Sequence, residues 1–152
     1  MGIEIEKKFL VNKKKWNKPN TGCLYTQAYL AKDGCTLRVR IAETKAFITI
    51  KGPTVGCSRK EFEYEIPMAD AQDMMKLTLY PPIVKIRYKQ EIGGKIWEID
   101  EFLDSNEGLI VAEIELNSEQ ESFIMPEWVD QEVTSDKRYT NASLSKHPYK
   151  SW

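Results

Sequence analysis

The stretch Ile3-Glu-Ile-Glu-Lys-Lys-Phe-Leu-Val11 alternates between charged and apolar side chains along most of its length. Because successive side chains of a β-strand point to opposite faces, Glu4, Glu6 and Lys8 share one face. The opposite face carries the apolar side chains Ile3, Ile5, Phe9 and Val11. The stretch therefore predicts a strand that places two carboxylates and an ammonium group in one row.

Seven further strands are expected, at 24–31, 35–42, 45–52, 59–66, 83–91, 94–103 and 109–116. Gly93-Gly94 is typical of a tight hairpin turn between two of them. A helix is expected at 69–79, between Pro67 and Pro81-Pro82, with short helical turns near 118–124 and 140–145. Eight strands with mostly short connections predict a mainly β (α+β) fold. We expect one eight-stranded antiparallel sheet closed into a barrel, forming a single domain of residues 1–152.

Charge is sorted by strand as well as by face. Two strands carry purely basic pairs and two carry purely acidic pairs: Arg38/Arg40, Lys85/Arg87, Glu98/Asp100 and Glu113/Glu115. For any single strand, a solvated charged face over an apolar core is the ordinary explanation. Taken together, the sorting and the scarcity of neutral polar residues favour a charged face that lines the barrel interior. The helix at 69–79 and the C-terminal segment would then cover the apolar outer face.

Such a barrel would have one cationic and one anionic wall. Clustered carboxylates repel one another unless a cation joins them, and sites with only oxygen ligands favour Mg²⁺ or Mn²⁺ over zinc. Clustered arginines and lysines favour phosphate oxygens. The combination is the arrangement that phosphoryl transfer needs, because positioning and charge stabilisation carry most of that catalysis.

The rest of the composition excludes several alternatives. A net charge of −1 gives no global basic surface for nucleic acid, and no apolar run suggests a membrane partner or a signal peptide, so we expect a cytoplasmic protein. Cys23, Cys35 and Cys57 have no C-x-x-C spacing and predict reduced thiols rather than zinc ligands. His147 is the only histidine and is expected at the surface, which leaves little basis for a Ser-His-Asp mechanism. The nucleophile is therefore expected to be water.

These strands also resemble the CYTH superfamily, the triphosphate tunnel metalloenzymes, in a series of motifs in family order. The motifs are E-x-E-x-K at 4–8, L-R-V-R at 37–40, T-I-K-G at 49–52, R-x-E-x-E at 59–63, K-x-R at 85–87, W-E-I-D at 97–100, A-E-I-E at 112–115 and V-T-S-D-K-R-Y-T-N at 133–141. The resemblance implies an eight-stranded antiparallel tunnel that acts on triphosphate-bearing substrates with a divalent cation.

The resemblance also implies roles for individual residues. Metal would be held by Glu4, Glu6, Glu113 and Glu115. Additional acidic groups would be Glu61, Glu63 and Asp100. The triphosphate would be bound by Lys8, Arg38, Arg40, Lys51, Arg59, Lys85 and Arg87. Tyr29 matches a tyrosine that some members pair with the lysine at position 51, and the alternative of a packing aromatic stays equally open.

The small bacterial-type members suggest hydrolysis of inorganic triphosphate (tripolyphosphate) or a related substrate by attack of an activated water. Glu61, Glu63 and Asp100 are candidates to orient that water, and Lys85 or a Tyr29–Lys51 pair could protonate the leaving phosphate. A class IV adenylyl cyclase, a thiamine triphosphatase and a non-catalytic polyphosphate or nucleotide binder remain alternatives. We expect a small-molecule polyphosphate ligand, and a monomer or homodimer.

Overall fold

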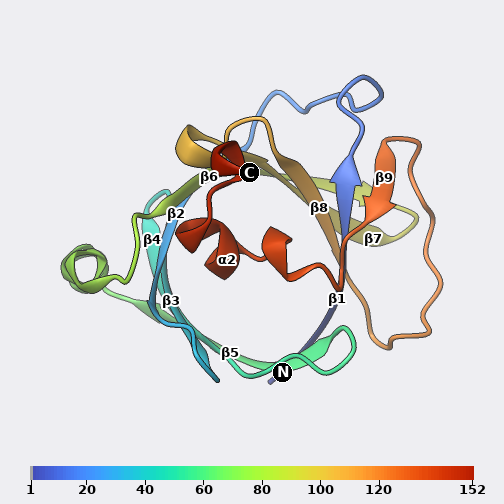
Figure 1. Cartoon of the computed structure of the whole chain (residues 1–152). Coiled ribbons are helices and arrows are strands. Elements are labelled where there is room, and N and C mark those ends of the chain that lie inside the picture. Colours follow the sequence, from blue (N-terminus) through green and yellow to red (C-terminus); the bar gives the residue numbers. More distant parts are fainter. Residues whose placement is uncertain (1) are drawn as a thin grey trace.

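The computed structural model describes residues 2–152, so Met1 of the predicted domain lies outside the described residues. The strands form one antiparallel sheet in the order β5-β4-β3-β2-β6-β7-β8-β1-β9, and β5 pairs again with β1. This second pairing closes β1–β8 into a barrel (Figure 1). The strands are β1 (Ile3–Val11), β2 (Cys23–Ala31), β3 (Thr36–Ala42), β4 (Lys45–Lys51), β5 (Ser58–Ile66), β6 (Ile83–Ile92), β7 (Lys95–Phe102), β8 (Ile110–Glu115) and β9 (Val129–Glu132).

The eight predicted strands are confirmed to within about two residues at each end. The β6–β7 hairpin turns at Gly93 and Gly94, both of which have positive φ, as a tight turn of this kind requires. The ninth strand, β9, was not predicted. It pairs with β1 at Phe9 and Val11, beyond the last residue of β1 that pairs with β5.

The helices are few and short. α1 (Met68–Met74) continues into the 3₁₀-helix η1 (Met75–Leu77) and occupies the predicted 69–79 position. α2 (Asn141–Lys146) confirms the helical turn expected near 140–145. The remaining 3₁₀ turns are η2 (Asp104–Asn106), η3 (Lys137–Tyr139) and η4 (Tyr149–Ser151). The helical turn expected at 118–124 is wrong, because this segment makes one turn at 118–121 and then runs without regular structure.

Two segments cover the apolar outside of the barrel. Ala71 of α1 is fully buried against Val39 and Ala46 on the outer face of β3 and β4, as predicted for this helix. The long connection before β9 covers the other side, where the ring of Trp97 lies 5.8 Å from Phe123 and 5.5 Å from Trp128 between centroids. Within residues 2–152, no helix has the length and apolar character needed to cross a membrane.

The C-terminal segment does not cover the outer face, and that prediction was wrong. α2 lies across one end of the barrel (Figure 1), and its Leu144 is fully buried. Leu144 packs with side chains on the inward-facing positions of four strands, namely Leu10, Ile83, Phe102 and Val111. Inward positions near this end of the barrel are therefore apolar. The C-terminal segment packs against them inside the barrel end and does not cover the outer face.

We expect Leu144→Ala to lower the free energy of unfolding by about 2–5 kcal/mol, because the substitution leaves a cavity in this apolar layer. Urea unfolding would measure the change. Leu77→Ala is the matched control, since Leu77 is 72% exposed and should change stability by less than about 0.5 kcal/mol. Equal effects of the two substitutions would contradict the burial of α2 in the barrel end.

Candidate functional site

The charged rows meet inside the barrel, where they line a cavity of about 570 Å³. Around the barrel, β4, β3, β2 and β6 are consecutive and supply most of the basic side chains. The consecutive strands β7, β8, β1 and β5 supply the acidic ones. The predicted cationic and anionic walls are thus the two halves of one closed sheet. The exceptions are Lys8 and Arg59, which project from the acidic half.

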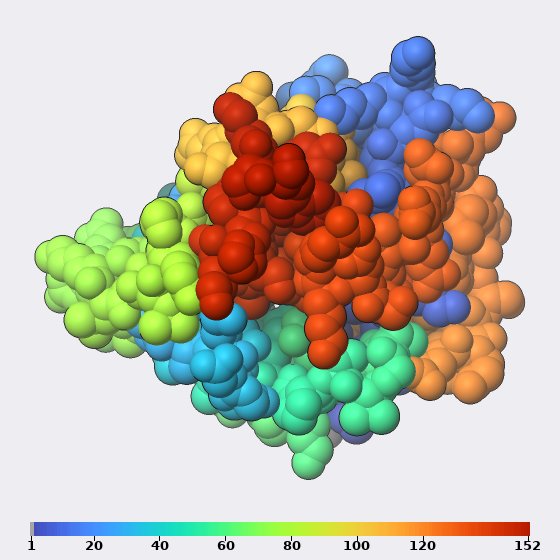
Figure 2. Space-filling model, in the orientation of Figure 1, coloured from blue at the N-terminus to red at the C-terminus, as the bar shows by residue number. Residues whose placement is uncertain are grey.

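One end of the cavity is largely closed by the C-terminal segment. Thr140, Asn141 and Ser143 line the cavity from this side. The β2–β3 and β4–β5 loops contribute Gly34 and Thr54 to the same end. Figure 2 shows a narrow opening between the C-terminal segment and these two loops.

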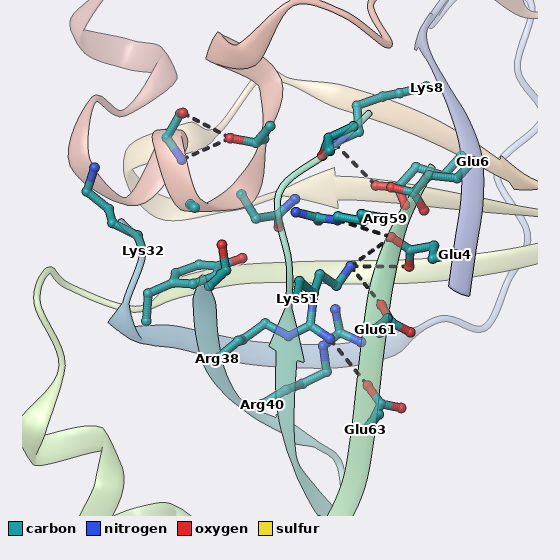
Figure 3. A pocket seen from close by; sticks show the side chains of 18 of the residues that line it. Glu4, Glu6, Lys8, Lys32, Arg38, Arg40, Lys51, Arg59, Glu61 and Glu63 are labelled. Atoms are coloured by element: carbon teal, nitrogen blue, oxygen red, sulfur yellow. Dashed lines mark hydrogen bonds and ion pairs between the residues drawn. The ribbon is translucent and has the colours of Figure 1, made fainter. Parts of the chain in front are cut away.

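Lys51, on the basic half, reaches across to the acidic half (Figure 3). Its Nζ lies 2.9 Å from Glu61 Oε2 and 3.2 Å from both carboxylate oxygens of Glu4. Arg59 Nε lies 3.5 Å from Glu4 Oε1. Burial and the neighbouring Glu61 raise the pKa of Glu4, although the charge of Lys51 opposes this rise. Burial opposes the charge of Glu61, but contact with Glu4 and the charge of Lys51 outweigh it and lower its pKa. The two carboxyl groups are therefore crowded beside one lysine.

Arg38 has spare hydrogen-bonding capacity. Its Nη2 donates to Thr49 Oγ1 at 3.0 Å and to Glu63 Oε2 at 3.3 Å, and Thr49 donates to the same carboxylate at 2.9 Å. Arg38 Nε is buried and finds no acceptor among residues 2–152. A buried donor without an acceptor is costly, so this nitrogen is suited to donate a hydrogen bond to a ligand oxygen.

Lys85, Arg87 and Asp100 form a buried cluster where β6 of the basic half pairs with β7 of the acidic half. Arg87 binds Asp100 through both Nε, at 2.7 Å from Oδ1, and Nη2, at 2.8 Å from Oδ2. Lys85 Nζ lies 2.7 Å from Asp100 Oδ2. Burial opposes the charge of Asp100, but the two cations outweigh it and lower its pKa to about 2. Burial, reinforced by Arg87 and Arg40, lowers the pKa of Lys85 to about 7. Arg87 thus neutralises Asp100, and Lys85 is the surplus cation.

The acidic wall is crowded around β1 and β8, where Glu6 pairs in register with Glu115, and Lys8 with Glu113. Burial, with Glu113 and Glu4 nearby, raises the pKa of Glu6 well above its ordinary value. Burial also raises the pKa of Glu115. The pKa of Glu113 is lowered despite burial, because Lys8 lies 3.6 Å away and Arg87 and Lys85 add further positive charge.

This donor set suits a hard divalent cation. No group of three His, Cys, Asp or Glu side chains within residues 2–152 is already gathered as a metal cluster. The carboxyl groups of Glu4, Glu6, Glu61 and Glu113 instead line the same cavity and influence one another's pKa. A divalent cation relieves repulsion between neighbouring carboxylates, and carboxylate oxygens are the ligands that Mg²⁺ and Mn²⁺ prefer.

Most of the residues singled out by sequence line this cavity, but two expected arrangements are absent. Tyr29 and Lys51 are not hydrogen-bonded in the described structure. The Tyr29 hydroxyl accepts from Gln27 Nε2 at 3.2 Å, while Lys51 faces Glu4 and Glu61. Asp100 does not line the cavity and lies behind Lys85 and Arg87, 1% exposed. Its expected part in orienting water stays a prediction.

Several residues that line the cavity were not predicted from the sequence. They are Tyr25, Lys32, Lys89, Lys137 and Asn141. Glu98, predicted to face the interior with Asp100, does line the cavity. Lys89 continues the alternation of Lys85 and Arg87, so strand parity could have found it. The C-terminal residues reach the cavity only because α2 enters the barrel end. The alternation of residues along strands cannot predict where a C-terminal helix packs.

Comparison with known proteins agrees with this geometry. The family model described as CYTH domain matches residues 2–149. An inorganic triphosphatase of Acetivibrio thermocellus is 45% identical over 154 residues, covering 100% of this chain and 99% of the relative. An inorganic triphosphatase of Nitrosomonas europaea is 35% identical over 147 residues, covering 93% and 96%.

Solved structures match as well. A crystal structure of an inorganic triphosphatase superposes with a TM-score of 0.67 and 32% identity, covering 93% of each chain. A structure from Bacillus halodurans, described as that of a candidate adenylate cyclase, has a TM-score of 0.62 at 19% identity. It covers 78% of this chain and 84% of its own, and it shares the fold alone.

In metal-free buffer, we expect Glu6→Gln to be at least as stable as the wild type at pH 8. The pKa of Glu6 is raised in the folded state, so the folded protein binds this proton more tightly than the unfolded chain. The contribution of Glu6 to wild-type stability should therefore fall as the pH rises above about 4.5, whereas the uncharged amide escapes this loss. Urea unfolding with EDTA between pH 4.5 and 8 measures the difference.

The exposed Glu127→Gln is the control and should follow the wild-type curve. Marked destabilisation of Glu6→Gln at pH 8 would show instead that Glu6 is an obligatory ion-pair partner of the basic side chains.

Proposed function

The chain belongs to the CYTH domain family, and from this membership we propose that it is a divalent-cation-dependent inorganic triphosphatase. The observation that carries the proposal is the enclosed cavity with a basic half facing an acidic half. A polyanion with bound cations is complementary to both halves at once. The full-length similarity to an inorganic triphosphatase supports the same reading.

The basic half would bind the triphosphate oxygens. Arg38 has a free buried Nε, and Lys85 carries charge beyond what Asp100 needs. The full set facing the substrate would be Arg38, Arg40, Lys51, Lys85 and Arg87, with Lys8 and Arg59 from the opposite half. Arginine can bind phosphate through two parallel hydrogen bonds, whereas lysine acts as a point charge.

The acidic half would hold Mg²⁺ or Mn²⁺ through Glu4, Glu6, Glu113 and Glu115. When bound, such a cation would neutralise phosphate charge and make a water molecule more acidic. Because burial raises the pKa of Glu4 and Glu6, a bound cation would favour their charged forms. The charged carboxylates would then also be able to orient water.

Hydrolysis requires water to form a bond to phosphorus while the anhydride P–O bond breaks. Glu61 and Glu63 line the cavity and are the candidates to accept the water proton. Asp100 is a weaker candidate because its pKa is about 2 and its oxygens already bind Arg87 and Lys85. Lys85 reaches the cavity and would donate a proton or a hydrogen bond to the leaving phosphate oxygen.

The function is tested by incubating tripolyphosphate, thiamine triphosphate and ATP with Mg²⁺, Mn²⁺ or no metal. We expect phosphate release from tripolyphosphate only with a cation. Glu115→Gln should lower kcat/KM by more than about 100-fold while the protein stays folded, because a ligand is lost. The control Glu127→Gln should match the wild type. Cyclic AMP with pyrophosphate would indicate a cyclase, and tight tripolyphosphate binding without turnover would indicate a binding protein.

The pH dependence of tripolyphosphate hydrolysis should follow the ionisation of the Lys85 amine. Because its pKa in the free protein is about 7, the amine loses its charge above neutral pH, and kcat/KM for tripolyphosphate should fall by about tenfold per pH unit there. Bound triphosphate favours the charged amine, so the corresponding fall in kcat should lie at higher pH. Lys85→Arg keeps its charge and should lose this limb, which separates it from titration of the substrate. An unchanged profile in Lys85→Arg would contradict the assignment.

A further inference from the structure

β2 is the one strand of the basic half whose inward row carries no charge. Its inward side chains include Tyr25, Gln27 and Tyr29. β2 lies between β3, which carries Arg38 and Arg40, and β6, which carries Lys85 and Arg87. A neutral strand therefore separates the Arg38/Arg40 pair from the Lys85/Arg87 pair.

Tyr25 contacts an arginine on each side. The guanidinium carbon of Arg40 lies 4.8 Å from the centroid of the Tyr25 ring, and that of Arg87 lies 4.9 Å from it. Tyr25 pairs in register with Ala42 on β3 and with Lys85 on β6, so both arginines are its diagonal neighbours. Each guanidinium is attracted to the electron-rich ring, which lets two like charges lie close to one another without direct contact.

Gln27 contacts the same arginine through a hydrogen bond. Its Oε1 accepts from Arg40 Nε at 2.9 Å, and its Nε2 donates to Asn141 Oδ1 at 3.0 Å. Asn141 Oδ1 also accepts from Lys85 Nζ at 2.8 Å. Gln27 is fully buried, so its amide has a fixed orientation and joins Arg40 on β3 to Lys85 on β6 through α2.

Arg40 depends on these contacts because it lacks an acidic partner. No carboxylate oxygen within residues 2–152 lies within 4.0 Å of its guanidinium, whereas Arg38, Lys51, Lys85 and Arg87 each have one. Burial and the neighbouring charges of Arg38 and Arg87 lower the pKa of Arg40 to about 10. Without Tyr25 and Gln27, repulsion would drive this side chain away from the other cations.

We propose that Tyr25 and Gln27 are positioning residues that hold Arg40 beside Arg87, so that both guanidiniums meet the triphosphate in a fixed geometry. This inference rests on the proposed function and adds to it two neutral residues that set the affinity of the basic half. They act through the arginines, and the carboxylate wall does not depend on them.

The first test measures kcat and KM for tripolyphosphate in Tyr25→Leu, Tyr25→Phe and the wild type. Tyr25→Leu keeps an apolar side chain but removes the ring, so KM should rise by about 5- to 30-fold. The value of kcat should change by less than about threefold, because the carboxylate wall is untouched. Tyr25→Phe retains the ring face and should restore a KM near that of the wild type. Tyr64→Leu, which removes a 59% exposed tyrosine from β5, is the control and should leave KM unchanged.

The second test is a double-mutant cycle with Arg40→Ala. If Tyr25 acts through this arginine, Tyr25→Leu should raise KM much less in the Arg40→Ala background than in the wild type. Gln27→Leu should show the same dependence on Arg40, and its thermal midpoint reports any loss of folding separately.

The outcomes separate this inference from the proposed function. If the wild type neither binds nor hydrolyses tripolyphosphate, the proposed function fails. If the wild type is active but Tyr25→Leu has an unchanged KM, the positioning inference alone is overturned. It is also overturned if the two substitutions are additive, or if Tyr25→Leu weakens ATP but not tripolyphosphate, since the ring would then contact the nucleoside.

Discussion

The arrangement of strands in this barrel depends on the compensation of its buried charges. Lys85 and Asp100 are each 1% exposed, and such groups are stable inside a protein only when opposite charges and hydrogen bonds replace water. A shift of β6 by one residue would turn Lys85 and Arg87 outward and bring Ile86 and Tyr88 into the interior. The polar lining therefore fixes the register of the sheet, a task that an apolar core performs in most barrels. The apolar rows face outward and must be covered by α1 and the connection before β9.

The buried charges of the interior are paired to different degrees. This difference explains how the site can be stably folded and still able to bind a ligand. Arg87 satisfies Asp100 with two hydrogen bonds, so Lys85 is held in place without being needed for neutralisation. Arg40 is held by a neutral amide and an aromatic ring. Basic side chains whose partners are neutral or shared are held in position, and their positive charge remains available to attract an anion. The carboxylates gathered on the opposite half are, in the same way, already positioned for a cation.

Alternation along the strands predicted the barrel and most of its charged lining, because a period of two follows directly from strand geometry. The same rule could not identify a role for Tyr25 or Gln27, because their proposed role depends on the arginines of the neighbouring strands β3 and β6. β9 was missed because Val129-Asp-Gln-Glu132 has no alternating apolar row and is placed by pairing with β1. The segment at 118–124 was expected to be helical, but Phe123 is held by Phe9 and Trp97 from distant strands. The C-terminal segment was assigned to the wrong side of the sheet, because apolarity alone does not distinguish the outer face from an apolar barrel end.

Closure of the barrel rests on a short seam between β1 and β5, made by Ile3–Lys60, Glu4–Arg59 and Ile5–Ser58. Much of the rest of β1 pairs with β8 (Ile110–Glu115), which lies far along the sequence. During synthesis β1 emerges long before β8, so the row that begins with Glu4 and Glu6 stays incomplete until β8 is available. Pairing over such a long sequence separation slows folding. The carboxylate wall is therefore complete only when strands from distant parts of the sequence have paired.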